Sequence, residues 1–99
     1  MKIAITSKGE WISSPFCSDF EKCEYLIIYD TLTNQYGSRR SPSFQTGDSA
    51  LLEDFFKKTL IKNIITGKDV NSNNLKIFTP SENASTVEEA IMEFLKTKG

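Results

Sequence analysis

The sequence predicts a single α/β domain in which helices pack on a β-sheet. The run Tyr25–Asp30 (YLIIYD) is apolar for five residues before it ends in an aspartate, which is typical of a strand buried on both faces. Residues 86–97 carry apolar side chains at helical spacing, which is typical of a helix packed on a sheet. With 99 residues, the chain is expected to form one domain, 1–99, around one core.

The N-terminal half reads as strands joined by turns. Strands are predicted at 2–6, 11–12, 25–30 and 35–40. The four residues between the last two strands favour a hairpin. Because 35–40 is polar, we place it at the edge of the sheet, and the apolar run 25–29 is placed at the centre.

The second half alternates helix and strand. A helix is predicted from Asp48 or Ser49, either of which can cap it, to about Thr59. Its apolar positions are Leu51, Leu52, Phe55 and Phe56. Strands are predicted at 61–66 and 75–78, and the polar segment 68–74 between them reads as a loop.

The last helix has the clearest start signal. Ser85-Thr86-Val87-Glu88 reads as a capping box, in which a hydroxyl and a carboxylate three residues later satisfy free N–H groups of the first turn. The apolar stripe behind it consists of Val87, Ala90, Ile91, Phe94 and Leu95. This stripe is predicted to pack on the sheet.

Composition argues against several classes of function. The net charge is −1, so there is no basic excess of the kind that nucleic-acid binding needs. No apolar run approaches the length of a membrane span, and a cytoplasmic location is expected. The chain has no histidine, which excludes Ser-His and Cys-His nucleophiles. We therefore do not expect an enzyme.

Both cysteines lie in one polar loop, just before the strand 25–30. Thiolates at Cys17 and Cys23 would suit a soft metal or an iron–sulfur species, whereas buried thiols would be ordinary core residues. Two thiols cannot complete a site of four ligands, so a cluster would need a second protomer, an exogenous ligand or oxygen donors such as Asp19 and Glu21. The flanking aromatic residues are expected to help close the core; they are Trp11, Phe16 and Phe20.

Four stretches, in order along the chain, resemble the dinitrogenase iron–molybdenum cofactor biosynthesis family. They are MKIAITS, SPFCSDFEKCEYLIIYD, IKNIITG and STVEEAIMEFLKTKG. The resemblance implies a ribonuclease-H-like mixed sheet flanked by helices, with one helix of the usual pattern lost at 68–74. It also implies a non-enzymatic protein that carries iron–molybdenum or iron–sulfur cofactor precursors in nitrogen fixation.

The resemblance also ranks the candidate ligands. Cys23 falls where the family often has cysteine or alanine, so it is the first candidate; Cys17 is the second, and Asp19 stands where many relatives have histidine. The molecule that the protein is expected to bind is then a metal cluster. The alternative is a metal-free protein-interaction or regulatory module on the same fold, which would have a protein partner. Neither of these two hypotheses implies binding to nucleic acid or to a membrane. The oligomeric state stays open.

Overall fold

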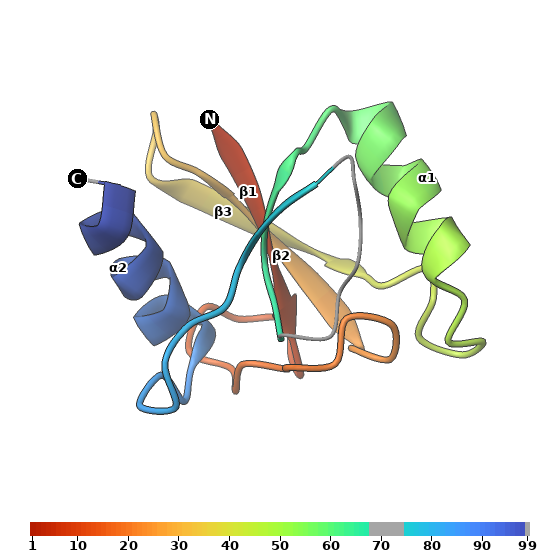
Figure 1. Ribbon diagram of the computed structural model, residues 1–99, viewed down its shortest axis with the longest axis horizontal. Coiled ribbons are helices and arrows are strands. Elements are labelled where there is room, and N and C mark those ends of the chain that lie inside the picture. The colour runs from red at the N-terminus through yellow and green to blue at the C-terminus, as the bar shows by residue number, and fades with distance from the viewer. Residues whose placement is uncertain (68–74, 99) are drawn as a thin grey trace.

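The computed structural model describes residues 1–67 and 75–98, and it places a five-stranded sheet between two helices (Figure 1). In chain order the elements are β1 (Lys2–Ser7), β2 (Tyr25–Asp30), β3 (Gln35–Arg40), α1 (Ser49–Thr59), β4 (Asn63–Ile65), β5 (Lys76–Phe78) and α2 (Val87–Lys98). The predicted α/β class is confirmed. Neither described helix is both long enough and apolar enough to cross a membrane.

The strand order is β3-β2-β1-β4-β5. β1 pairs antiparallel with β2 and parallel with β4, so β1 is the middle strand. The prediction that 25–29 would be central is therefore wrong, although β2 is an inner strand and mostly buried. The reason is the crossover through α1, which returns the chain parallel to β1 on its free side. The hairpin of β2 and β3 is confirmed.

Alternate residues of the strands feed two separate cores, one on each face of the sheet. The α2-side core consists of Ile3, Ile5, Ile27, Tyr29, Ile65, Val87, Ala90, Ile91 and Phe94. The α1-side core consists of Ala4, Cys17, Phe20, Cys23, Leu26, Leu52, Phe56, Ile61 and Ile64. In Figure 1 the two helices lie on opposite sides of the sheet, which matches this division.

Helix α1 begins where the sequence predicts. Asp48 caps it, with Oδ1 accepting the N–H of Ala50 at 3.0 Å. Leu52 and Phe56 are buried, whereas Leu51 is exposed and Phe55 is half-buried. The helix therefore covers the sheet with a narrower stripe than the sequence suggested.

The capping box of α2 lies one residue later than predicted. The Glu89 N–H donates to Thr86 Oγ1 at 3.2 Å, and the Thr86 N–H donates to Glu89 Oε1 at 3.1 Å. The segment STVEE contains two overlapping boxes. Val87 is fully buried as the first helical residue, which makes Thr86 the N-cap.

The loop between β1 and β2 contains no strand at 11–12, so that prediction is wrong. The Ser14 N–H donates to the Trp11 carbonyl at 2.9 Å, which closes a turn over these residues. Trp11 is 65% exposed and does not help close the core, whereas Phe20 does. The isolated bridges of this loop lie further on, where Phe16 pairs with Ser7 and Pro15 pairs with Thr86.

Two predicted strands are shorter than expected. β4 covers Asn63–Ile65 of the predicted 61–66, and β5 covers Lys76–Phe78 of the predicted 75–78. The predicted loop at 68–74, and with it the expected loss of a helix there, lies outside the described residues.

Candidate binding site at the carboxyl edge of the sheet

Strands β1, β4 and β5 are joined by parallel pairing, and their carboxyl ends share one edge. From β1 the chain turns to β2 on one side, and it returns later to β4 on the other side. In open α/β sheets, ligands bind at the carboxyl edge where the strand order diverges in this way. A ligand site is therefore expected at the carboxyl ends of β1 and β4.

A depression of about 370 Å³ lies at this edge. It is lined by Phe16, Ser18, Gly67, Thr79, Pro80, Ser81, Glu82 and Ala84. Gly67 is required by a close approach, because a Cβ at this position would lie 2.0 Å from the carbonyl oxygen of Ser18. The lining offers three hydroxyl groups, one carboxylate and apolar surface, which suits a small ligand held by hydrogen bonds and van der Waals contact.

One wall of the depression is tied to the ends of β1 and β4. The Cys17 N–H donates to the Thr6 carbonyl at 3.1 Å, and the Thr6 hydroxyl donates to the Cys17 carbonyl. Thr6 Oγ1 also lies 2.8 Å from Thr66 Oγ1, and both threonines are fully buried. Because these hydrogen bonds are shielded from water, they hold the loop firmly against the sheet.

The opposite wall is held by α2. Glu93 accepts hydrogen bonds from the N–H and the hydroxyl of Ser81, at 2.8 and 2.7 Å. These two hydrogen bonds hold the pKa of Glu93 below its usual value. The depression therefore lies between two anchored segments.

Both predicted cysteine ligands are buried in the α1-side core. The Sγ atoms of Cys17 and Cys23 lie 3.6 Å from the carbonyl oxygens of Asp19 and Phe20, respectively. Burial raises the pKa of Cys23 to about 12, so its thiol is protonated at neutral pH. Although Phe16 and Ser18 line the depression, the Cys17 side chain between them packs into the α1-side core.

Asp19, the predicted oxygen ligand, serves a turn. Its Oδ1 accepts the N–H groups of Glu21 and Lys22 at 3.1 and 3.0 Å. Within residues 1–67 and 75–98, no three His, Cys, Asp or Glu side chains are grouped so that they could hold a metal ion. The predicted metal-ligating residues are thus close together along the chain, but their donor atoms do not point to a common site.

Sequence reasoning did not single out the residues that build the depression. Thr6, Thr66, Gly67 and Ser81 carry no reactive group that attracts attention in a linear sequence. The available signal was positional, because Thr66 and Gly67 follow β4 directly and a glycine at the end of a parallel strand often permits a close approach.

Comparison with known proteins supports the fold. No family model and no curated protein matches the chain. A NifB-like protein of the DUF35 family from Thermotoga shares 22% identity over 96% of this chain and 87% of its own, with a TM-score of 0.76. The apo form of the orange protein from Desulfovibrio gigas shares 18% identity over 98% and 88%, with a TM-score of 0.79. At these identities the comparisons establish a shared fold, which extends over nearly the whole chain.

Proposed function

We propose that the protein is a small, non-enzymatic, cytoplasmic binding protein, related to carriers of nitrogenase cofactor precursors, and that its ligand occupies the carboxyl-edge depression. The observation that carries this proposal is the depression itself, which lies where the strand order diverges and is bounded by two anchored walls. The fold shared with the NifB-like protein and the orange protein supports a cofactor-related ligand.

The resemblance implies an iron–sulfur cluster or an iron–molybdenum cofactor precursor as that ligand. The thiols do not fit direct coordination of such a cluster, because Cys23 is fully buried with a pKa raised to about 12 and Cys17 is turned into the core. Among the residues that line the depression, Ser18 and Thr79 have hydroxyl groups available as donors, whereas the Ser81 hydroxyl already donates to Glu93. A ligand held there would be bound through its outer atoms rather than by thiolates.

Non-enzymatic binding is also supported by the chemistry of the lining. Glu82 is the single carboxylate among the residues that line the depression, and the chain has no histidine to act with it. General acid–base catalysis usually needs two groups with different proton affinities. The lining offers groups for binding and orientation.

The second candidate is a metal-free interaction or regulatory module on the same fold. The burial of both cysteines favours it, because buried free thiols behave as small apolar groups. On this alternative the depression would receive part of a protein partner.

Anaerobic purification, followed by incubation with iron and sulfide and by iron, sulfide and molybdenum analysis, tests the proposal. We would compare wild type with Cys17→Ala, Cys23→Ala and Ser18→Tyr, which fills the depression. Ser13→Tyr is the matched control, because Ser13 is exposed on the same loop and does not line the depression.

We expect visible absorption and bound metal in wild type, in both cysteine variants and in Ser13→Tyr, with loss in Ser18→Tyr. Loss of metal in folded cysteine variants, with retention in Ser18→Tyr, would contradict our site and favour thiolate ligation. If wild type binds no metal under any of these conditions, the interaction module becomes the better account.

A further inference from the structure

Strand β3 leaves one edge of the sheet unpaired within the described residues. It pairs with β2 on one side, and all six of its residues are exposed. An unpaired strand of this length is a ready template for a further strand.

The hydrogen-bond pattern shows which backbone groups of β3 point outward. The Ser41 N–H donates to the Glu24 carbonyl at 2.9 Å, and these two residues continue the register in which Arg40 lies opposite Tyr25. Alternate residues of an antiparallel strand bond the same neighbour. The backbone N–H and C=O groups of Gly37 and Arg39 therefore point toward β2. Those of Tyr36, Ser38 and Arg40 point away from β2, to the free edge of the sheet.

A groove runs beside β3 on the α1 side of the sheet, with a volume of about 530 Å³. Ile28 and Phe55 give it apolar surface, and both are only half-buried. Gly37 opens the groove toward the outer edge, because a Cβ built on it meets no atom within 4 Å. A side chain opposite Gly37 on an added strand could therefore reach across it.

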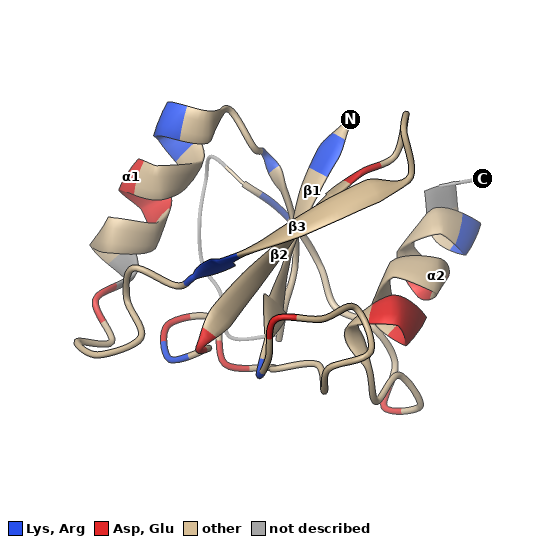
Figure 2. Cartoon of the chain, turned by 180° about the vertical axis from the view of Figure 1, so that it is seen from behind, with Lys and Arg blue, Asp and Glu red and all other residues tan. Residues whose placement is uncertain are grey.

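The groove and the adjoining end of β3 carry three cations, although the whole chain is slightly acidic. Lys2 and Arg39 line the groove, and Arg40 follows at the end of β3, which is blue in Figure 2. The Arg39 guanidinium lies 5.8 Å from the ring centre of Phe55, and that of Arg40 lies 5.4 Å from the ring centre of Phe44. Both cations are thus held in position beside the free edge.

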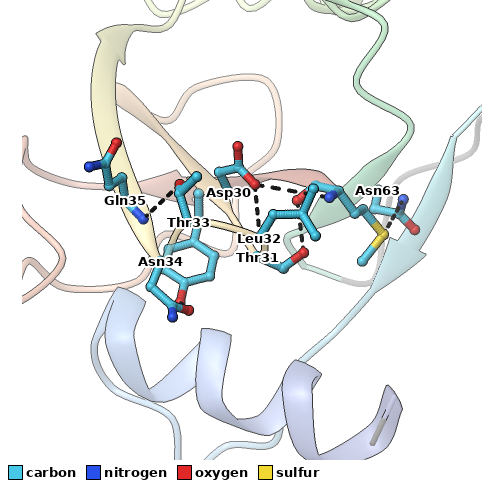
Figure 3. A network of polar contacts seen from close by, with 9 residues as sticks. Asp30, Thr31, Leu32, Thr33, Asn34, Gln35 and Asn63 are labelled. Carbon is cyan, nitrogen blue, oxygen red and sulfur yellow. Dashed lines mark hydrogen bonds and ion pairs between the residues drawn. The ribbon is translucent and has the colours of Figure 1, made fainter.

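The one carboxylate that lines the groove is already engaged. Asp30 Oδ1 accepts the Leu32 N–H at 2.9 Å and lies 4.0 Å from the amino group of Met1. Figure 3 shows the contacts of Asp30 at the hairpin turn. At the same turn the Tyr29 hydroxyl donates to Asn34 Oδ1 at 2.7 Å. The turn fixes the start of β3 before any partner binds, which lowers the entropic cost of binding.

We propose that β3 binds an extended acidic peptide segment of a partner protein, which adds to the sheet as a sixth strand. Hydrogen bonds from the outward backbone groups would supply affinity. An apolar side chain opposite Gly37 would enter the groove, and carboxylates opposite Arg39 and Arg40 would select acidic sequences. A second copy paired through the same strand is disfavoured, because β3 contains no carboxylate that could face Arg39 or Arg40.

This surface is separate from the proposed ligand site. The groove lies beside β3, and none of the residues that line it also lines the depression at the carboxyl ends of β1 and β4. A defect at either site can therefore be measured without disturbing the other.

Titration of the isotope-labelled protein with the capped peptide SEETVTTS tests the proposal. Read antiparallel to β3, this peptide places glutamates opposite Arg40 and Arg39 and valine opposite Gly37. We expect amide shifts concentrated in β3 and slower amide exchange at Tyr36, Ser38 and Arg40. The peptide SKKTVTTS and a short oligothymidine serve as charge controls.

Ser38→Pro removes one outward N–H and leaves the bonds between β3 and β2 in place, so the affinity should fall by roughly tenfold or more. Ser38→Thr is the matched control and should bind like wild type. Arg39→Glu combined with Arg40→Glu should reverse the preference in favour of the lysine peptide. Circular dichroism on each variant confirms that it is folded.

Three results would overturn the proposal. The first is no binding of SEETVTTS, or equal binding of the lysine peptide. The second is equal binding of oligothymidine, which would indicate a general polyanion surface. The third is self-association of wild type by sedimentation equilibrium that Ser38→Pro abolishes, because the occupant would then be a second copy.

Discussion

The two faces of the sheet are covered in different ways. On the α2 side, the helix itself supplies four buried side chains, and Phe94 meets Phe78 edge to face at 5.4 Å. On the α1 side, the helix supplies Leu52 and Phe56, and the loop before β2 completes the core with Phe20 and both cysteines.

The difference explains the double role of that loop. Its inward side chains fill the part of the α1-side core that helix α1 does not cover. Cysteines in such a position must be uncharged thiols that pack as small apolar groups. Its outward side chains, including Ser18, line the depression. We therefore assign the cysteines to the core and propose that a ligand binds on the other side of the same loop.

The largest expected effect contrasts the closed face with the open groove. Phe94→Ala should lower the free energy of unfolding by roughly 3–5 kcal/mol, because Phe94 is buried in the α2-side core. Phe55→Ala should cost only about 1–2 kcal/mol, because Phe55 is half-buried at the groove. Urea denaturation of both variants measures this contrast, and equal losses would contradict an open groove.

Alkaline pH should weaken the α1-side core through Cys23. The pKa of this thiol rises from its ordinary value of 9.0 to about 12 in the folded protein, because burial disfavours the thiolate. Between these values the unfolded chain binds fewer protons, so the free energy of unfolding falls as pH rises, by up to about 1.4 kcal/mol per pH unit. This contribution is fully present below about pH 9.

Cys23→Ala is the control for this pH dependence. Denaturant titrations at about pH 8 and about pH 11 should show wild type losing about 2–3 kcal/mol more than the variant. Parallel losses in the two proteins would mean that Cys23 ionises at its ordinary pKa and that this part of the core admits water.

A smaller effect concerns the start of α2, which closes the α2-side core. Thr86→Ala should cost about 1 kcal/mol, because it removes the hydroxyl that caps the helix. Ser85→Ala should cost less than about 0.5 kcal/mol, because the hydroxyl of the exposed Ser85 donates to the Glu89 carboxylate and caps no backbone N–H. Thermal unfolding of the pair decides which of the two overlapping boxes is used; the reverse order of losses would favour Ser85.

The smallest effect is a gain in stability on the α1 side. Leu60 ends α1 in the left-handed region, with φ 60°, and it is 80% exposed. Leu60→Gly should raise the free energy of unfolding by about 0.5–1 kcal/mol, because glycine adopts this conformation without the steric cost. A loss of stability on denaturant titration would show that the Leu60 side chain packs somewhere.

Most of the fold could be predicted because its elements carry local signals. Residues that are close in sequence specify the apolar run of β2, the caps of both helices and the hairpin between β2 and β3. The order of strands is not local, since β1 becomes central only when β4 returns to its free side. Trp11 and Ile12 show the same limit, because an apolar pair in a turn resembles a short strand.

The candidate site was less predictable than the fold. Thiols attract attention in a sequence, but whether Cys17 and Cys23 face solvent depends on which side of the loop the sheet covers. The depression depends on backbone geometry, such as the close approach of Ser18 to Gly67. Residue types alone do not predict such an approach. Chemical reactivity was therefore a poorer guide than position at the end of a parallel strand.

The central claim is that the cysteines are core residues of the α1 side, and thiol labelling tests it most directly. The reaction of each single-cysteine variant with a soluble aromatic disulfide can be followed beside its unfolding rate. For Cys23, which is fully buried, we predict labelling no faster than global unfolding and rapid labelling in denaturant. Labelling of the native protein at the rate of an exposed thiol would contradict the account.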